Sequence, residues 1–372
     1  MKQEVRPVPL SGPYIDERDE ELVLEVLRSG RLSLGPMIDR FEEAFAAKVG
    51  APYAAAVSSG TAGLHLLCVS AGIAPGDEVI TSPYSFAASA NCFIYEGGVP
   101  VFADIDARTY NLDPAAVEAA VTERTKAIVA VDIYGYPCEL DPLRAIAERH
   151  GLALIQDSCE ALGAEYKGAQ LGTHGPPAVF AFYPNKQMTT GEGGMVTTHS
   201  EEEWRLLRSL RNQGRGDSGG WLEHVRLGFN YRMDDVSAAL GIGQVEKLDE
   251  ILRLRGVVAA RYNELLAGIG GVELPCADDA EHKRSWFVYV VALPDNDARE
   301  RAIAHFEREG IGFNRYLPSI HLQPYMRERY GFREGLCPVS EDLSSRTLAL
   351  PFFTALERDA QERVAEALAA AL

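Results

Sequence analysis

Three polar segments of this sequence could do chemistry together. Residues 58–61, Ser-Ser-Gly-Thr, follow an apolar run and precede a helical pattern. A glycine turn at a helix N-terminus favours an anion such as a phosphate. Asp157 ends the apolar run LALIQDS, where a carboxylate needs a cationic or N–H partner. Lys186 lies between an apolar run and a Thr/Gly-rich turn, where a desolvated amine can become a nucleophile.

Each segment also has an ordinary structural explanation. Residues 58–61 could only cap a helix, Asp157 could be the N-cap of a helix that follows it, and Lys186 could be a surface lysine. Together, however, they offer an anion anchor, a carboxylate for a ring nitrogen and an amine for an aldehyde, which pyridoxal 5'-phosphate (PLP) requires. PLP also needs a flat apolar face, and Phe86 is the candidate for offset stacking, with core packing as the alternative.

The elements that must position these residues form an alternating series. From about residue 53 to 199, short apolar runs alternate with helical patterns, which predicts βαβ units and a mostly parallel sheet covered on both faces. The runs PAVFAFY and GMVTTH follow one another without a helix, which indicates an antiparallel member. Open α/β sheets bind ligands at the carboxyl ends of their strands, where the three polar segments fall.

The rest of the chain predicts a second, smaller unit. A long helical pattern covers residues 234–268, followed by the strand-like run RSWFVYVVAL, a helical pattern with Asn296 as its candidate N-cap, and a terminal helix. A chain of 372 residues also exceeds the size of about 250–300 residues at which single cores stop growing. We therefore expect an α/β fold with a large three-layer αβα domain, residues 1–245, and a small C-terminal α+β domain, residues 246–372.

Composition excludes several classes of protein. The formal charge of −18, from 36 basic and 54 acidic residues, argues against nucleic acid as the main partner. No apolar run approaches the about 20 residues that span a bilayer, and no apolar signal segment opens the chain, so we expect neither membrane insertion nor secretion. Six cysteines without a CxxC pair, and histidines without an HExxH spacing, indicate free thiols, no metal site and a cytoplasmic location.

Seven segments in order carry a family resemblance. The sequence resembles the sugar-nucleotide aminotransferase (DegT/StrS) family of PLP-dependent enzymes over nearly its whole length, which implies the fold type I aminotransferase architecture. The segments are SGRLSLGPMIDRFEEAFA (29–46), SSGTAGL (58–64), GDEVITSPYSFAASANC (76–92), QDSCEALGAEYKG (156–168), FYPNKQMTTGEGGMV (182–196), GFNYRMDDVSAALG (228–241) and HLQPYM (321–326).

The resemblance implies a role for each cofactor-binding residue. Lys186 resembles the lysine that forms a Schiff base with PLP and shuttles the substrate proton. Asp157 resembles the carboxylate that keeps the pyridine nitrogen protonated, and Glu160 stands near the phenolic oxygen of the cofactor. Phe86 occupies the stacking position. Gly60 and Thr61 match the phosphate-binding turn.

Other positions are implied to bind substrate or to come from a second subunit. Asn230 resembles the residue that reaches the phosphate from the neighbouring subunit, which implies a homodimer with shared active sites. Arg232 is a candidate for the carboxylate of the amino donor, with a rim ion pair as the alternative. Candidate contacts to the amino acceptor are Arg315, Tyr316 and His321, and capping of a turn is the alternative for the histidine.

Three positions depart from the common family pattern. Ala181 stands where many members have serine, so one hydroxyl donor to the phosphate is missing, and a backbone amide, Tyr183 or Ser59 could compensate. Gln213 and Phe287 each replace a frequent histidine. The first change concerns affinity for the cofactor, whereas the other two concern substrate contacts.

The lysine at position 186 favours one reaction class, because relatives with histidine there act as sugar dehydratases. We expect ping-pong transamination, in which an amino acid, L-glutamate, donates its amine and a nucleotide-linked keto-deoxysugar accepts it. The segment EALGAEYKG favours a 4-keto-6-deoxyhexose acceptor and a role in surface polysaccharide. A PLP-dependent dehydratase or lyase and a non-catalytic PLP-binding regulator remain as alternatives. A nicotinamide oxidoreductase is set aside because the chain lacks a GxGxxG turn with its downstream acid.

Overall fold

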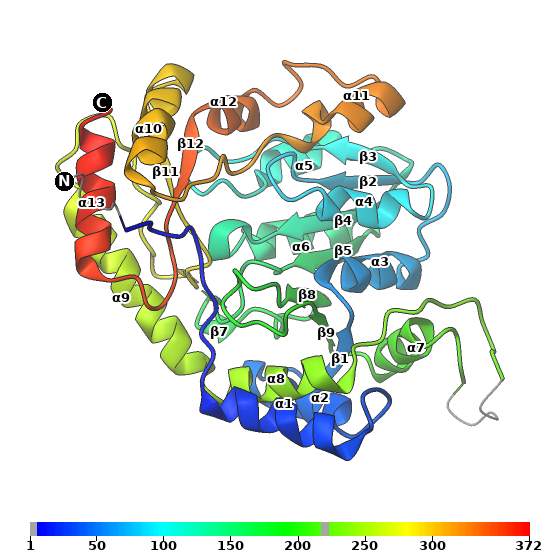
Figure 1. Ribbon diagram of the computed structural model, residues 1–372. Helices are drawn as coiled ribbons and strands as arrows, with labels where there is room; N and C mark the ends of the chain where they lie inside the picture. Colours follow the sequence, from blue (N-terminus) through cyan, green and yellow to red (C-terminus); the bar gives the residue numbers. More distant parts are fainter. Residues whose placement is uncertain (1–5, 217–222) are drawn as a thin grey trace.

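The computed structural model describes residues 6–216 and 223–372 (Figure 1). The strands are β1 (Tyr53–Val57), β2 (Glu78–Thr81), β3 (Val99–Phe102), β4 (Thr125–Val131), β5 (Ala153–Asp157), β6 (Glu165–Tyr166), β7 (Ala169–Gln170), β8 (Ala178–Ala181), β9 (Gly194–Thr198), β10 (His282–Lys283), β11 (Tyr289–Ala292) and β12 (Thr347–Leu350). The α-helices are α1 (Glu17–Ser29), α2 (Met37–Val49), α3 (Gly60–Ser70), α4 (Ala88–Ile94), α5 (Pro114–Ala120), α6 (Leu140–His150), α7 (Glu201–Arg211), α8 (Asp235–Glu246), α9 (Leu248–Leu266), α10 (Asn296–Glu309), α11 (Pro324–Tyr330), α12 (Pro338–Arg346) and α13 (Arg358–Ala369). Two 3-10 turns are η1 (Ile133–Gly135) and η2 (Ile320–Leu322).

The central sheet is mixed and mostly parallel, as the sequence predicts. Its strand order is β1-β9-β8-β5-β4-β2-β3. Only β9 runs against its neighbours, because it pairs antiparallel with both β1 and β8, whereas the remaining pairs are parallel. A parallel pair needs a long crossover, usually a helix, and the segment between β8 and β9 has none. The carboxyl ends of the parallel strands β5 and β8 therefore lie together at one edge.

Helices cover both faces of this sheet and make a three-layer α/β architecture, in agreement with the sequence. Successive residues of a strand point to opposite faces, so Ala54 and Ala56 belong to one hydrophobic cluster while Ala55 and Val57 belong to another. The first cluster is completed by side chains of α1, α2, α6 and α8, and the second by those of α3, α4 and α7. The sheet is thus buried on both faces, and the polar residues lie at the carboxyl ends of its parallel strands.

A separate hydrophobic cluster surrounds the two-stranded sheet of β11 and β12. Side chains of α9, α10 and α13 pack on this sheet, and Figure 1 shows these helices together near both chain termini. Val8 joins the same cluster and pairs with Ile311, so the N-terminal segment packs with the C-terminal part of the chain. The division at residues 245 and 246 stays a prediction.

Two local expectations differ from the structure. The helical pattern of residues 234–268 forms two helices, α8 and α9, because the chain breaks at Lys247, whose amine pairs with Asp16 and Asp19 near the start of α1. The N-cap of α10 is Asp295 rather than Asn296, since the Asp295 carboxylate accepts the Ala298 N–H at 2.8 Å. A carboxylate at the N-cap also complements the positive end of the helix.

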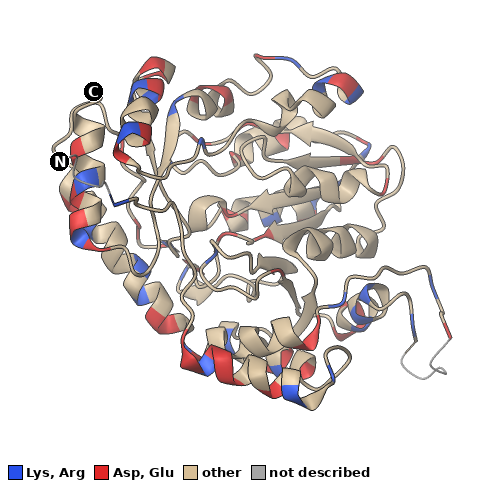
Figure 2. Cartoon of the chain, in the orientation of Figure 1, with Lys and Arg blue, Asp and Glu red and all other residues tan. Residues whose placement is uncertain are grey.

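Charged side chains lie mainly on the outer helices. Figure 2 shows acidic and basic residues interspersed along α1, α9 and α10, with few on the central strands. Among residues 6–216 and 223–372, no helix has both the length and the apolar character needed to cross a membrane.

Candidate active site

A cavity of about 560 Å³ opens at the edge where β5 and β8 end and α3 and α4 begin. Its volume lies within the roughly 300–1,000 Å³ typical of small-molecule sites. Seven residues singled out from the sequence line it together: Gly60, Thr61, Phe86, Asp157, Glu160, Lys186 and Tyr316. The structure therefore brings together segments that are up to 256 positions apart in the sequence, since residues 60 and 316 share one cavity.

Lys186 lies on the turn between β8 and β9, which the Lys186 N–H closes by donating to the Tyr183 carbonyl at 2.9 Å. Its amine is mostly buried and lies 3.4 Å from Glu160 Oε1. On another side the amine lies 3.9 Å from the centre of the Phe287 ring. The surface-lysine alternative is therefore wrong, because this amine faces the cavity between an acid and an aromatic ring.

Glu160 is held by the backbone as well as by the lysine. Its Oε2 accepts the Tyr134 N–H at 3.0 Å, and the Gln187 side chain donates to its carbonyl at 2.6 Å. Burial raises the pKa of Glu160 above its ordinary value, and the positive charge of Lys186 opposes that rise. The result is a carboxyl group with a fixed orientation at the wall of the cavity.

Asp157 is the last residue of β5 and is buried. One carboxylate oxygen accepts the Ser89 hydroxyl at 2.7 Å, and Ser89 in turn lies 2.7 Å from the Ser85 hydroxyl. The other oxygen accepts the Cys159 N–H at 3.2 Å. No α-helix follows Asp157, because the next element is the short strand β6, so the helix N-cap alternative is wrong. The carboxylate lines the cavity with its orientation set by two donors, the Ser89 hydroxyl and the Cys159 N–H.

The start of α3 forms part of the cavity wall. Ser59 caps the helix by accepting the Ala62 N–H at 3.1 Å. The amides of Gly60 and Thr61 belong to the first turn, whose N–H groups have no intrahelical acceptor, and they lie at the positive end of the helix. A Cβ on Gly60 would lie 2.8 Å from both Ala181 Cβ and Cys159 Sγ, so only glycine permits this close approach. The Ser59 cap uses the Ala62 N–H, so it leaves the Gly60 and Thr61 amides available to an anion.

Phe86 lines the cavity with 66 % of its surface exposed. Core packing, the alternative for this residue, is therefore wrong. Tyr183 is also exposed and lines the same cavity. Burying an exposed aromatic ring against a flat ligand is favourable, and these two rings are available for that contact.

Asn230 and Arg232 do not reach this cavity. Both belong to the segment that returns to α8, next to Tyr231, whose carbonyl accepts the Ser58 N–H at 2.8 Å just before α3. Asn230 is exposed and pairs through its backbone with Asn212. Arg232 donates to the Asn212 side chain at 2.9 Å and lines a different cavity of about 170 Å³ with Arg208 and Arg211. Burial and the neighbouring arginines lower the pKa of Arg232.

Two expected acceptor contacts are not at the cavity. His321 is fully buried, and its Nε2 lies 2.9 Å from Glu341 Oε1, so its ring cannot reach a substrate in this arrangement. Arg315 is exposed and forms an ion pair with Glu300 at 2.6 Å, outside the cavity lining. The structure places neither of these two side chains in the cavity lining, so their contact with the acceptor stays a prediction. Tyr316 does line the cavity, together with Asn314.

Several lining residues were not singled out as site residues from the sequence. They are Ser59, Leu64, Ser85, Ala88, Val131, Cys159, Ala181, Tyr183, Asn185, Glu192, Gly193, Phe287, Asn314 and Leu317. Phe287 is held in place by Arg255 of α9, whose guanidinium donates to the Phe287 carbonyl at 2.6 Å and to the Asn185 carbonyl at 3.4 Å. The only sequence signal for Phe287 was its departure from the histidine of the family pattern.

The lining residues fit PLP. The cavity combines a lysine amine, an oriented carboxylate, an exposed aromatic ring and a helix N-terminus with free first-turn amides, which match the aldehyde, the ring nitrogen, the ring face and the phosphate. No serine hydroxyl is available at position 181, but Ser59 and Tyr183 line the same cavity. The donor set therefore meets each requirement of the cofactor.

Comparisons with known proteins agree with this geometry. Residues 13–369 match the DegT/DnrJ/EryC1/StrS aminotransferase family. The spore coat polysaccharide biosynthesis protein SpsC of Bacillus subtilis is 39 % identical, covering 97 % of this chain and 96 % of that protein. The GDP-perosamine synthase of Caulobacter vibrioides is 38 % identical, covering 85 % of this chain and 86 % of that protein.

A solved structure has the same fold. Helicobacter pylori PseC, an aminotransferase involved in the biosynthesis of pseudoaminic acid, superposes with a TM-score of 0.93 at 28 % identity, covering 98 % of this chain and 99 % of that chain. Related structures in PLP and pyridoxamine forms identify the cofactor. The chain belongs to the DegT/DnrJ/EryC1/StrS aminotransferase family of PLP-dependent enzymes.

Proposed function

We propose that this enzyme transfers an amino group from L-glutamate to a nucleotide-linked keto-deoxysugar by a ping-pong reaction. The observation that carries the proposal is the position of the Lys186 amine, 3.4 Å from Glu160 in a cavity that also contains Asp157 and the start of α3. Amino transfer needs a lysine amine that can form and break a covalent bond to the cofactor and can also carry a proton. A buried lysine between an acid and an apolar ring supports that role.

PLP, when bound, supplies an aldehyde that condenses with amines and a ring that draws electrons from the neighbouring carbon. In the proposal, Asp157 holds a proton at the ring nitrogen, and the hydroxyls of Ser85 and Ser89 fix its carboxylate. Glu160 lies near the phenolic oxygen and orients the cofactor. Phe86 covers one face of the cofactor ring, and Lys186 moves the substrate proton. The amides of Gly60 and Thr61 hold the phosphate.

We also propose a homodimer with shared active sites, because the cavity of one chain lacks cations for its ligands. Among the described residues, the only basic side chain that lines the cavity is Lys186, whereas Asp157, Glu160 and Glu192 also line it. The cofactor phosphate, the carboxylates of glutamate and the sugar diphosphate are all anionic. Asn230 and Arg232, which do not line the cavity of their own chain, are proposed to supply contacts to the cavity of the second chain.

The proposed acceptor is a 4-keto-6-deoxyhexose linked to a nucleotide, for surface polysaccharide. The relatives that act in spore coat polysaccharide and GDP-perosamine biosynthesis support this class of acceptor. Within the cavity, Tyr316 and Asn314 are the proposed contacts to the sugar. The cytoplasm is the proposed compartment, which the six free cysteines support.

The test is a half-reaction with purified, PLP-loaded enzyme and no acceptor. L-Glutamate should convert the visible absorbance of the bound cofactor to that of the pyridoxamine form and release one 2-oxoglutarate per site. Adding a nucleotide-linked 4-keto-6-deoxyhexose should then restore the starting spectrum. D-Glutamate is the matched control and should leave the spectrum unchanged.

The outcomes separate the remaining alternatives. Elimination of a substituent from the sugar without release of 2-oxoglutarate would indicate a dehydratase or lyase. Bound cofactor that responds to neither substrate would indicate a regulator that binds PLP without turnover. Either result would overturn the proposed transamination.

A further inference from the structure

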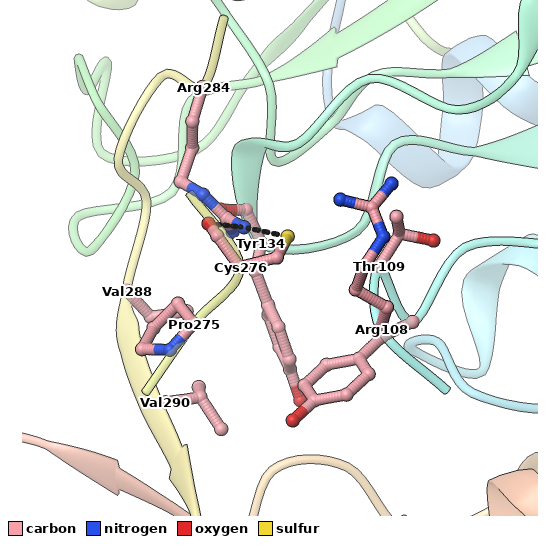
Figure 3. A pocket seen from close by; sticks show the side chains of 9 residues that line it. Arg108, Thr109, Tyr134, Pro275, Cys276, Arg284, Val288 and Val290 are labelled. Atoms are coloured by element: carbon pink, nitrogen blue, oxygen red, sulfur yellow. Dashed lines mark hydrogen bonds between the residues drawn. The ribbon is translucent and has the colours of Figure 1, made fainter. Parts of the chain in front are cut away.

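A small cavity lies outside the active site, between the turn at Arg108, Tyr134 and residues 275–290 (Figure 3). Its free volume of about 10 Å³ has room for one particle the size of a water molecule, so it is too small for a substrate. A group of buried polar side chains around His65, which the proposed mechanism does not use, has a more specific arrangement.

His65 is a buried residue of α3, the helix whose first turn lines the active-site cavity. Its Nε2 lies 2.7 Å from Oε1 of Glu96, in the turn after α4, and its Nδ1 lies 3.1 Å from the Tyr231 hydroxyl. Tyr231 belongs to the segment between α7 and α8, so the ring of His65 connects three segments of the chain. These three side chains are called the His65 network below.

Glu96 sets the tautomer of His65. A carboxylate can only accept, so the proton of the neutral ring lies on Nε2, and Nδ1 is left to accept the Tyr231 hydroxyl. The side chains of α3 and α4 around this network belong to one hydrophobic cluster. Apolar contacts are non-directional, whereas the hydrogen bond to His65 fixes the direction of the Tyr231 side chain.

Residues 229–231 extend along the end of α7. The N–H groups of Phe229 and Tyr231 donate to carbonyls of the last turn of α7 at 2.6 and 2.9 Å. Successive side chains of an extended segment point to opposite sides. The rings of Phe229 and Tyr231 lie with their centres 4.8 and 5.8 Å from that of His65, whereas Asn230, between them, is exposed. Packing of the two rings against α3 therefore turns Asn230 outward.

A main-chain bond also joins this segment to the start of α3. The Tyr231 carbonyl accepts the Ser58 N–H at 2.8 Å, two residues before Gly60. This bond does not involve the Tyr231 side chain, so loss of the hydroxyl leaves it in place. The hydroxyl instead holds the residue that directly follows Asn230 in the sequence.

We propose that the His65 network positions Asn230 for the cavity of the second chain. His65, Glu96 and Tyr231 are then positioning residues for the cofactor of the other subunit, since they act through Asn230 and do not line the cavity of their own chain. The inference rests on the homodimer with shared active sites proposed above.

The first test measures the Kd of each apoenzyme for PLP by equilibrium dialysis. Tyr231→Phe keeps the ring but removes the hydroxyl, and its Kd should rise by about tenfold, because Asn230 no longer has a fixed position at the phosphate. Tyr95→Phe is the matched control, since the Tyr95 ring contacts another edge of His65 and is exposed. Its Kd should equal that of the wild type. Equal Kd values for the two variants would overturn the proposal.

Two substitutions of His65 separate its two hydrogen bonds. His65→Asn places an amide oxygen near the position of Nδ1, where it can still accept the Tyr231 hydroxyl. His65→Gln places its amide near the position of Nε2 and keeps only the contact with Glu96. His65→Asn should therefore bind PLP more tightly than His65→Gln, and the opposite order would contradict the role of Tyr231.

Hybrid dimers identify which cavity the network serves. In both hybrids one chain carries Lys186→Ala, so borohydride can attach PLP only to Lys186 of the other chain. In the first hybrid Tyr231→Phe is in the same chain as Lys186→Ala, and in the second hybrid it is in the opposite chain. The PLP concentration for half-maximal labelling should rise about tenfold in the first hybrid only. The reference is a hybrid of Lys186→Ala with wild type.

The outcomes separate this inference from the proposed reaction. An increase in the second hybrid would show that the network acts on the cavity of its own chain, and no increase in either would show that it does not position Asn230. Both results overturn the inference, and a protein that is monomeric in solution overturns it together with the shared active sites. The expected labelling in an enzyme that does not respond to L-glutamate would support the network and overturn only the transamination.

Discussion

The Lys186 amine lies 3.9 Å from the centre of the Phe287 ring, within the range of a cation–π contact. Phe287 is almost fully buried, and Arg255 of α9 holds its carbonyl at 2.6 Å. The Phe287 ring, which comes from a different part of the chain, thus keeps the Lys186 amine in place for reaction with the PLP aldehyde. Phe287 stands at a position where the family resemblance implies a frequent histidine.

Phe287→Leu should slow attachment of PLP to the apoenzyme by about tenfold, because a cation–π contact of about 0.5–2 kcal/mol no longer holds the amine. Phe287→Tyr keeps an aromatic face and should attach the cofactor at nearly the wild-type rate. Stopped-flow absorbance after mixing apoenzyme with PLP measures both rates. Equal rates of PLP attachment for Phe287→Leu and the wild type would show that the ring does not position Lys186.

Lys186→Ala and Asp157→Asn should fail in different ways. Lys186→Ala should lose the covalent label that borohydride reduction leaves on the wild-type peptide. Asp157→Asn should keep the label but slow the glutamate half-reaction by about 100-fold or more, since proton transfer depends on the charge that supports the ring. Peptide mapping and single-turnover spectra separate the two effects. Loss of the label in both variants would contradict distinct roles.

Ala181→Ser should tighten PLP binding. Ala181 lines the cavity beside Gly60, at the end where the helix N-terminus is exposed. A hydroxyl there adds a charge-assisted hydrogen bond to the phosphate, which should lower the Kd for PLP by about tenfold. Equilibrium dialysis of the two apoenzymes measures the change. Ala181→Val, which adds bulk without a donor, is the control and should not tighten binding.

Asp132 should make the stability of the protein depend on pH in the acidic range. It is fully buried at the end of β4 and accepts bonds from Ser158, Gln156 and the Cys138 N–H, and burial raises its pKa from 3.8 to about 6. Between these values the folded state holds a proton that the unfolded state has lost. The free energy of unfolding should therefore fall as the pH rises from 4 to 6.

The size of this effect is on the order of 3 kcal/mol for the full shift. Urea unfolding of wild type and Asp132→Asn at several pH values between 4 and 7 measures it. The free energy of unfolding of the wild type, relative to that of Asp132→Asn, should increase as the pH falls from 6 to 4, because only the wild type takes up a proton on folding in this range. A difference that stays constant with pH would show that Asp132 has an ordinary pKa in the folded protein.

The sequence predicted the parts of the site that follow from local position. Asp157 and Lys186 stand directly at or after buried strands, and the parallel sheet brings such positions to one edge. Phe86, Gly60 and Thr61 were found for the same reason. The single antiparallel strand β9 was also foreseeable, since no helix separates it from β8.

Other features depend on contacts between distant segments. His321 and Arg315 looked available for substrate, but each has an acidic partner, Glu341 and Glu300, that only folding brings near. Ser85 and Ser89 were missed as supports of Asp157 because a serine in a strand-to-helix connection carries no signal of its partner. Phe287 comes from beyond α9, and nothing local connects it with Lys186.

The wall formed by Asn314 and Tyr316 has a consequence for how the protein unfolds. These residues come after α10, while the opposite walls come from the central sheet, and the Tyr84 hydroxyl donates across to the Tyr316 carbonyl at 3.0 Å. A molecule held between the two walls acts as a removable cross-link. Occupancy should merge the β11–β12 part and the sheet into one cooperative unit, so that amide protons in both regions become protected together when substrate is present.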